Sequence, residues 1–192
     1  MTENSIYHQL REFREHMELP PHMTWPEISG AHLVMMMSPR PRHQLTAKAI
    51  ARELDAQLPE GLWTFEATDI EDSALAELRV PDLLIVPPAA METDDPLDPR
   101  EIELAIEIVS PTNPENDYKK KVRVYPAMGI PVYLIVDPRD GTWTLYDVIG
   151  TEDGRPAYEN RLHRSYGVPV QIGDWKIETA DLPRYSDKDM RS

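Results

Sequence analysis

The 192-residue sequence contains no cysteine and no long apolar run, and these absences exclude several classes of protein. Without cysteine the chain can form no disulfide, zinc ribbon, iron–sulfur cluster or thiol nucleophile, and nothing indicates an oxidising compartment. No uncharged apolar run approaches the ~20 residues of a membrane span, and the start, MTENSIYHQLREF, lacks the basic and then apolar pattern of an export signal. We therefore expect a cytoplasmic protein with no membrane segment.

Basic residues are also in short supply. The 20 Lys and Arg residues stand against 34 Asp and Glu, which gives a formal net charge of −14 at pH 7. Such a field repels polyanions, so general electrostatic binding to nucleic acid or to an acidic membrane is disfavoured. Any contact with nucleic acid has to depend on local basic groups or on bound cations.

Glycine is scarce as well, and its eight residues are scattered singly. The sequence has no G-x-S-x-G, G-x-x-x-x-G-K-[ST], G-x-G-x-x-G or H-E-x-x-H motif, so nucleotide-binding loops and zinc-protease helices have no support. The six histidines show no metal-ligand spacing. His43 differs from the others because it lies on the apolar face at the start of a predicted helix, beside Arg40 and Arg42.

Proline, in contrast, is abundant at 19 residues, which predicts many short elements that end abruptly. Helical spacing of apolar residues predicts helices over residues 6–17, 42–58 and 114–128. Alternating or apolar runs predict strands over 25–28, 32–37, 62–67, 80–86, 101–109, 132–136 and 142–148, with weaker strands near 158–162 and 168–172. We expect one domain of the α/β (α+β) class over residues 1–182, built around one sheet, and a disordered polar tail over 183–192.

Two acidic residues interrupt strands that are otherwise apolar. Asp82 directly precedes the apolar run 83–86, and Glu107 lies near the end of the strand predicted over 101–109. An unpaired carboxylate in such a place carries a large desolvation penalty, which a divalent metal held by two carboxylates and a backbone carbonyl would compensate. The structural alternative is that Asp82 begins a strand and that Glu107 partners a basic side chain.

The predicted helix 114–128 carries three consecutive lysines. At ~100° per residue, Lys121 falls on the arc that carries the apolar and aromatic side chains. The neighbouring basic residues form a solvated face: Lys119, Lys120 and Arg123. Lys121 is therefore either a buried cation close to the two acids or a lysine whose stem lies along the apolar face while its ammonium reaches water.

These residues resemble the Uma-type family of restriction-endonuclease-like proteins, within the PD-(D/E)XK nuclease superfamily. The resemblance extends from residue 33 to about residue 148. Five short motifs carry it in order: Met37-Ser38-Pro39 to His43, Pro81-Asp82, Glu107-Ile108-Val109-Ser110-Pro111, Asp117 with Lys121 and Tyr125, and Gly129-Ile130-Pro131 with Tyr133 and Asp137-Pro138. The fold that the resemblance implies is a restriction-endonuclease-like α/β core, with a mixed central sheet flanked by helices.

The resemblance also implies a function, the metal-dependent hydrolysis of phosphodiester bonds with DNA as substrate. It makes Asp82, Glu107 and the carbonyl of Ile108 the ligands of one Mg²⁺ or Mn²⁺. The lysine usually found two residues after the second acid is absent, because Val109 stands there. The resemblance implies that Lys121 supplies the catalytic amine instead.

Further residues follow from the position of this site. Glu27 matches a glutamate that often precedes the first hairpin in the family, and Glu27 and His43 are candidates to support the metal ligands. The local basic groups that would contact nucleic acid are Arg40, Arg42, Lys119, Lys120 and Arg123. A homodimer is suggested only by the need to cut two strands.

Two other functions stay open at this point. The net charge of −14 favours a protein of nuclease fold that no longer cleaves and serves as a binding or assembly module, because active nucleases commonly present basic surface to the backbone. A metal-dependent phosphoesterase acting on a small substrate is the other, since a negative surface matters less for it. The intact set of Asp82, Glu107 and Lys121 favours the nuclease.

Overall fold

A six-stranded sheet forms the centre of the structure, a computed structural model that describes residues 3–111 and 113–190. Its strands are β3 (Trp63–Glu66), β6 (Leu83–Val86), β7 (Leu104–Ile108), β8 (Val132–Asp137), β9 (Thr142–Glu152) and β10 (Arg155–Ser165). They lie in the order β10-β9-β8-β7-β6-β3, where β7 and β8 pair in parallel and the other neighbours antiparallel. The predicted mixed sheet is confirmed.

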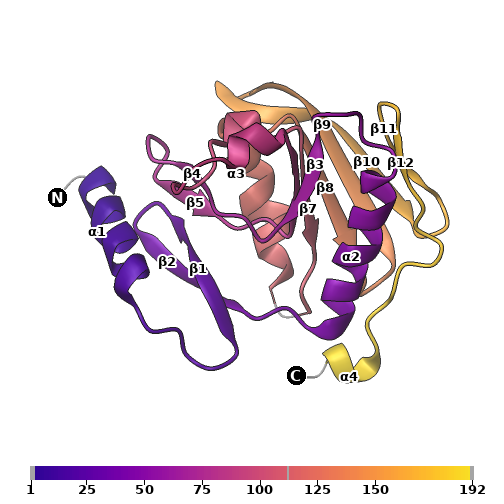
Figure 1. The fold of residues 1–192 in the computed structure, drawn as a ribbon, viewed down its shortest axis with the longest axis horizontal. Coiled ribbons are helices and arrows are strands. Elements are labelled where there is room, and N and C mark those ends of the chain that lie inside the picture. The colour runs from indigo at the N-terminus through magenta and orange to yellow at the C-terminus, as the bar shows by residue number, and fades with distance from the viewer. Residues whose placement is uncertain (1–2, 112, 191–192) are drawn as a thin grey trace.

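Helices cover both faces of this sheet (Figure 1). On one face lies α2 (Pro41–Asp55), which packs through Ala47, Ile50, Ala51 and Leu54. On the other face lie the π-helical segment η3 (Asn116–Lys121) and α3 (Val122–Ala127). Because all five residues of β7 are buried between these layers, β7 is a rigid support for any side chain at its end.

A second sheet forms a smaller layer beside the first (Figure 1). Its strands are β1 (Met23–Ser29), β2 (His32–Met37), β4 (Ile70–Asp72) and β5 (Glu77–Arg79), in the order β2-β1-β5-β4. The leading helix α1 (Glu3–His16) packs on it around Tyr7, Ile28 and Leu78. The leading helix and the β1–β2 hairpin were predicted, whereas β4 and β5 were not, because strands of three residues are too short to show an alternating pattern.

The remaining elements are short. They are the 3₁₀ turns η1 (Pro88–Met91) and η2 (Pro99–Glu101), the hairpin β11 (Val170–Ile172) and β12 (Trp175–Ile177), and the terminal turn α4 (Asp187–Met190). The chain after β12 passes to the N-terminal end of α2, where α4 lies (Figure 1). Residues 183–190 belong to the polar tail that was expected to be disordered, but this segment contacts the body of the protein, and Tyr185 is buried.

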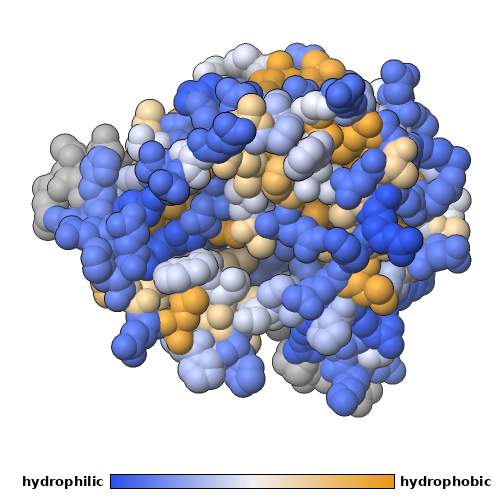
Figure 2. Space-filling view, viewed as in Figure 1, coloured by the Kyte–Doolittle hydropathy of each residue, from blue (hydrophilic) through white to orange (hydrophobic). Residues whose placement is uncertain are grey.

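The face drawn in Figure 2 is mostly hydrophilic, and its hydrophobic side chains lie in small, separate patches. An extended apolar patch commonly marks a docking surface, and this face shows none. None of the helices in the described ranges has the length and apolar character that a membrane crossing requires.

Candidate active site

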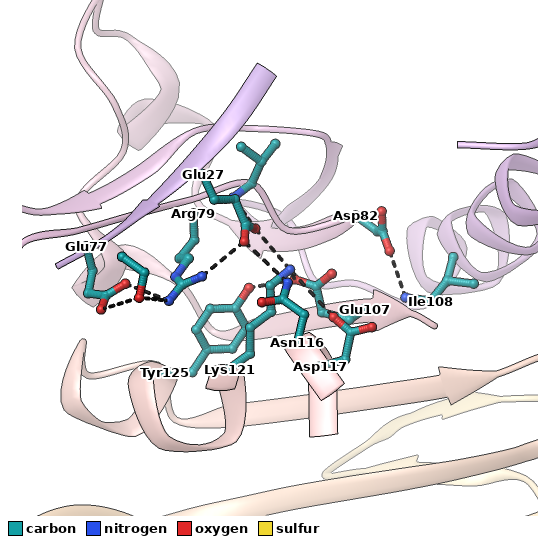
Figure 3. Close-up of polar contacts among 12 residues, drawn as sticks. Glu27, Glu77, Arg79, Asp82, Glu107, Ile108, Asn116, Asp117, Lys121 and Tyr125 are labelled. Carbon is teal, nitrogen blue, oxygen red and sulfur yellow. Dashed lines mark hydrogen bonds and ion pairs between the residues drawn. The ribbon is translucent and has the colours of Figure 1, made fainter. Parts of the chain in front are cut away.

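Strands β6 and β7 bring the two predicted acids together. They pair antiparallel with Leu83 opposite Ile106, so Asp82, directly before β6, lies beside Glu107 near the end of β7. The backbone N–H of Ile108 donates a hydrogen bond of 2.7 Å to Oδ2 of Asp82 (Figure 3). The register of the sheet therefore fixes the Asp82 carboxylate next to the end of β7.

The other oxygen of Asp82 contacts helix α2. His43, in the first turn of that helix, is buried, and its Nε2 lies 2.9 Å from Oδ1 of Asp82. An ionised carboxylate only accepts hydrogen bonds, so His43 is the donor in this pair. The Asp82 side chain is still 24% exposed, which leaves it open to solvent and to a ligand.

Lys121 lies at the centre of a buried group of carboxylates (Figure 3). Its Nζ is 2.7 Å from Oε1 of Glu107, 3.1 Å from Oε1 of Glu27 and 3.7 Å from Oδ1 of Asp117. Burial opposes the charged amine, but these carboxylates outweigh burial and hold the pKa of Lys121 above its ordinary value. Lys121 is thus a fixed cation, and with 1% of its side chain exposed it does not reach water.

The turn that carries Lys121 is π-helical. Each π turn takes in more residues than an α turn, and in this one Asn116, Asp117 and Lys121 are buried while Lys119 and Lys120 are exposed. Single π turns within helices are frequent at functional sites. The α-helical spacing placed Lys121 inward correctly, but it gave no indication that Asn116 is buried.

Glu27, in β1, connects this group to the smaller sheet. It is fully buried, and its Oε2 accepts from Nη1 of Arg79 at 3.1 Å and from Nδ2 of Asn116 at 3.3 Å. Burial alone would raise the pKa of Glu27, but Lys121 and Arg79 outweigh burial and lower the pKa to about 2. Arg79, in β5, also pairs with Glu77 at 2.7 Å. Arg79 and Glu77 were missed because β5 was not predicted.

The contacts of Glu107 and Asp117 compensate only part of the cost of burying their carboxylates. Tyr125 donates a hydrogen bond of 2.5 Å to Oε1 of Glu107, the same atom that contacts Lys121. Burial raises the pKa of Glu107 well above its ordinary value and that of Asp117 to about 7, with Lys121 opposing the rise and the charge of Asp82 adding to it. Tyr125 belongs to a family motif in the sequence, but the motif does not indicate its contact with Glu107.

Acids therefore outnumber permanent cations in the cluster. The acids are Glu27, Glu77, Asp82, Glu107 and Asp117, and the cations are Arg79 and Lys121. If all of them were ionised, five negative and two positive groups would carry a formal charge of −3, and burial together with this surplus of negative charge raises the pKa of Glu107 and Asp117. Uncompensated charge in a buried place is costly, so this cluster favours an added cation.

The donors suit a hard divalent cation. Asp82 and Glu107 supply carboxylate oxygens at adjacent strand ends. In residues 3–111 and 113–190, no three acidic or histidine side chains converge to hold an ion by themselves. Mg²⁺ usually binds proteins through one or two carboxylates and keeps several waters, so two acids fit this ion.

The predicted nucleic-acid contacts divide into two sets. Lys119, Lys120 and Arg123 are exposed on η3 and α3, and Lys119 pairs with Glu115 at 2.5 Å. The other two basic residues contact the C-terminal segment: Nη1 of Arg40 donates to the carbonyl of Asp189 at 2.8 Å, and Nη1 of Arg42 donates to the carbonyl of Arg184 at 2.7 Å.

Comparison with known proteins adds a family and a related fold. The model of the Uma2 family, whose description is "Putative restriction endonuclease", matches residues 10–163. The crystal structure of "a putative nuclease belonging to DUF820" from Anabaena variabilis ATCC 29413 superimposes with a TM-score of 0.64 and 17% sequence identity, and the match covers 94% of this chain and 96% of that chain. At this identity the likeness concerns the fold. No curated protein matches the chain.

Proposed function

We propose that this chain, which belongs to the Uma2 family, is a metal-dependent nuclease that hydrolyses phosphodiester bonds of DNA. The position of Lys121 carries the proposal. Its protonated amine touches Glu107 at 2.7 Å, inside the rigid core and next to Asp82, so two acids and one lysine meet at the end of β7. A lysine that served packing alone would extend to water instead.

Asp82, Glu107 and the carbonyl of Ile108 would hold Mg²⁺ or Mn²⁺. When bound, such an ion lowers the pKa of water and neutralises charge that builds on the phosphate. The chain's own part is to hold these ligands: the amide of Ile108 and His43 orient Asp82, while Tyr125 and Lys121 orient Glu107.

Lys121 has a second part in this proposal. Because its raised pKa keeps it protonated, it cannot accept a proton from water. Held beside Glu107 and buried, it would act through its fixed positive charge, which stabilises negative charge in the transition state. In a site with little access to water such a fixed charge is more effective than in bulk solvent.

A phosphoesterase acting on a small substrate is the second candidate. The observation that favours it is the engagement of Arg40 and Arg42 by the C-terminal segment, in a chain of net charge −14. Fewer basic groups are then presented to a long phosphate backbone.

The deciding experiment measures cleavage of double-stranded DNA, single-stranded DNA, RNA and bis(p-nitrophenyl) phosphate during titration with Mg²⁺ or Mn²⁺, with EDTA as the blank. Glu107→Gln removes the charge of one proposed ligand, and Glu103→Gln is its matched control because Glu103 is exposed just before the same strand. We expect metal-dependent cleavage of DNA by the wild type and by Glu103→Gln, and none by Glu107→Gln. Cleavage of the small diester alone would select the second candidate, and the absence of all cleavage with both metals would reject both.

A further inference from the structure

We propose that Tyr185 is a positioning residue of the candidate site, whose hydroxyl orients His43 and, through His43, the carboxylate of Asp82. The inference rests on the proposed function for its catalytic meaning. It concerns a residue outside the range 10–163 that the family model matches, so the family match does not include it.

Tyr185 bridges the ends of the two parallel strands. Its backbone N–H donates to the carbonyl of Pro138, directly after β8, at 2.9 Å. Its hydroxyl donates to the carbonyl of Val109, directly after β7, at 3.0 Å. The residue is 9% exposed, so packing and two hydrogen bonds hold the ring at the edge of the sheet where Glu107 and Asp82 lie.

The hydroxyl also reaches His43. It lies 3.4 Å from Nδ1 of His43, whose Nε2 lies 2.9 Å from Oδ1 of Asp82. Since the carboxylate only accepts, Nε2 must carry a hydrogen, and Nδ1 is left to the hydroxyl. The hydroxyl has one hydrogen, so it donates either to the carbonyl of Val109 or to Nδ1 of a neutral His43, whereas a charged His43 donates to the hydroxyl while the hydroxyl donates to Val109. In either case Tyr185 favours the ring orientation in which Nε2–H faces Asp82.

The neighbours of Tyr185 tie it to the same helical turn that carries His43. Nη1 of Arg42, the residue before His43, donates to the carbonyl of Arg184 at 2.7 Å, and its Nε lies 3.3 Å from the Asp189 carboxylate. The C-terminal segment is thus anchored on both sides of Tyr185 to the start of α2. This arrangement fixes the hydroxyl relative to the imidazole.

The test compares two variants that each lose one hydroxyl. Tyr185→Phe keeps the ring and removes the contacts with His43 and Val109. Tyr166→Phe is the matched control, because the Tyr166 hydroxyl is buried and has no hydrogen-bond partner in the described part of the chain. Three quantities are measured: the ¹⁵N resonances of the His43 ring, the Mn²⁺ concentration at the midpoint of the metal-induced rise in Tm, and kcat and KM for DNA cleavage.

For Tyr185→Phe we expect shifted His43 resonances, a Mn²⁺ midpoint raised about 10- to 100-fold, and kcat lowered by a similar factor with KM unchanged. Tyr166→Phe should match the wild type in all three. Unchanged His43 resonances in Tyr185→Phe would overturn the inference, and so would shifted resonances with an unchanged Mn²⁺ midpoint. If the wild type neither binds Mn²⁺ nor cleaves, the proposed function fails, and the His43 resonances alone decide whether Tyr185 orients the ring.

Discussion

Replacing Lys121 with methionine tests how far the buried carboxylates depend on one ammonium. Methionine keeps most of the packing of the lysine stem but leaves Glu27, Glu107 and Asp117 without the cation that lies 2.7 to 3.7 Å from them. Removing one partner of a buried ion pair typically costs ~3–5 kcal/mol. We expect a loss of this size in the free energy of unfolding.

Glu27 provides a separate estimate of the magnitude. Lys121 and Arg79 together hold the pKa of Glu27 at about 2, against an ordinary 4.5. At ~1.4 kcal/mol per pKa unit, this difference corresponds to about 3 kcal/mol of stabilisation at neutral pH. Arg79 accounts for part of that value, and the contacts of Lys121 with Glu107 and Asp117 add to the rest. Both estimates are therefore of the order of a few kcal/mol.

The expected loss depends on pH in a defined direction. A carboxylate with a lowered pKa stabilises the fold above its ordinary pKa, and this contribution disappears as the pH falls through the lowered value. For Glu27 the contribution is complete above about pH 4.5 and is lost toward about pH 2. The difference between the wild type and Lys121→Met should therefore be full at pH 8 and smaller at pH 4.

The assay is urea unfolding of the wild type, Lys121→Met and Lys120→Met at both pH values. Lys120 is the adjacent, exposed lysine, so its replacement should change the free energy of unfolding by less than about 0.5 kcal/mol. Equal urea midpoints for the two variants at pH 8 would refute the ion-pair reasoning. In cleavage assays Lys121→Met should be ~10²–10⁴ times slower than the wild type, and near-normal rates would remove Lys121 from the mechanism.

Three other outcomes are expected. Asp82→Asn removes one of two neighbouring negative charges, so the metal-free protein should be equally or more stable, and its Tm should no longer rise with Mn²⁺; an unchanged rise would contradict the ligand assignment. Burial raises the pKa of Asp117 to about 7, so ionisation of Asp117 should lower the stability of the wild type as the pH rises from about 4 to 7. Thermal unfolding measured across this pH range should show the decline in the wild type and not in Asp117→Asn. Charge reversal at Lys119 and Lys120, both exposed, should weaken nucleic-acid binding without unfolding the protein, with affinity falling steeply between ~50 and 200 mM salt; salt-independent binding would point to another ligand.

Sequence patterns predicted the helices and strands that carry a long, regular series of apolar residues. In α2 the apolar residues Ala47, Ile50, Ala51 and Leu54 recur at the helical spacing along the buried face, and the strands around Glu107 are nearly continuous apolar runs, so their existence follows from burial alone. Strand β5 has three residues, two of them charged, and its burial depends on the ion pair of Arg79 with Glu27, 52 residues away, as well as on the pair of Arg79 with Glu77 within the strand. No local pattern identifies such a strand.

The residues of the candidate site also fall into those that the sequence indicates and those that only the structure shows. Asp82, Glu107 and Lys121 could be selected as candidates because an acid or a lysine in an apolar setting is conspicuous in the sequence itself. Asn116 was missed because its burial depends on a contact with Glu27, 89 residues away, and Tyr185 because its hydroxyl bonds to a carbonyl 76 residues away. Contacts over such separations arise from the packing of the sheet and helices, which short motifs do not encode.

The charge of the site also constrains how it can bind a phosphate. Its own cations are already committed: Lys121 is surrounded by three carboxylates, and Arg79 pairs with Glu27 and Glu77. A phosphate that enters meets a net negative field, so the protein's side chains alone repel it. The one divalent cation of the proposed function would bring the formal charge of the cluster from −3 to −1, so we expect substrate affinity as well as cleavage to depend on it. We therefore expect a chain with a net charge of −14 to act on a polyanion through a small contact region, in which bound cations and exposed basic residues such as Lys119 and Lys120 supply the positive charge.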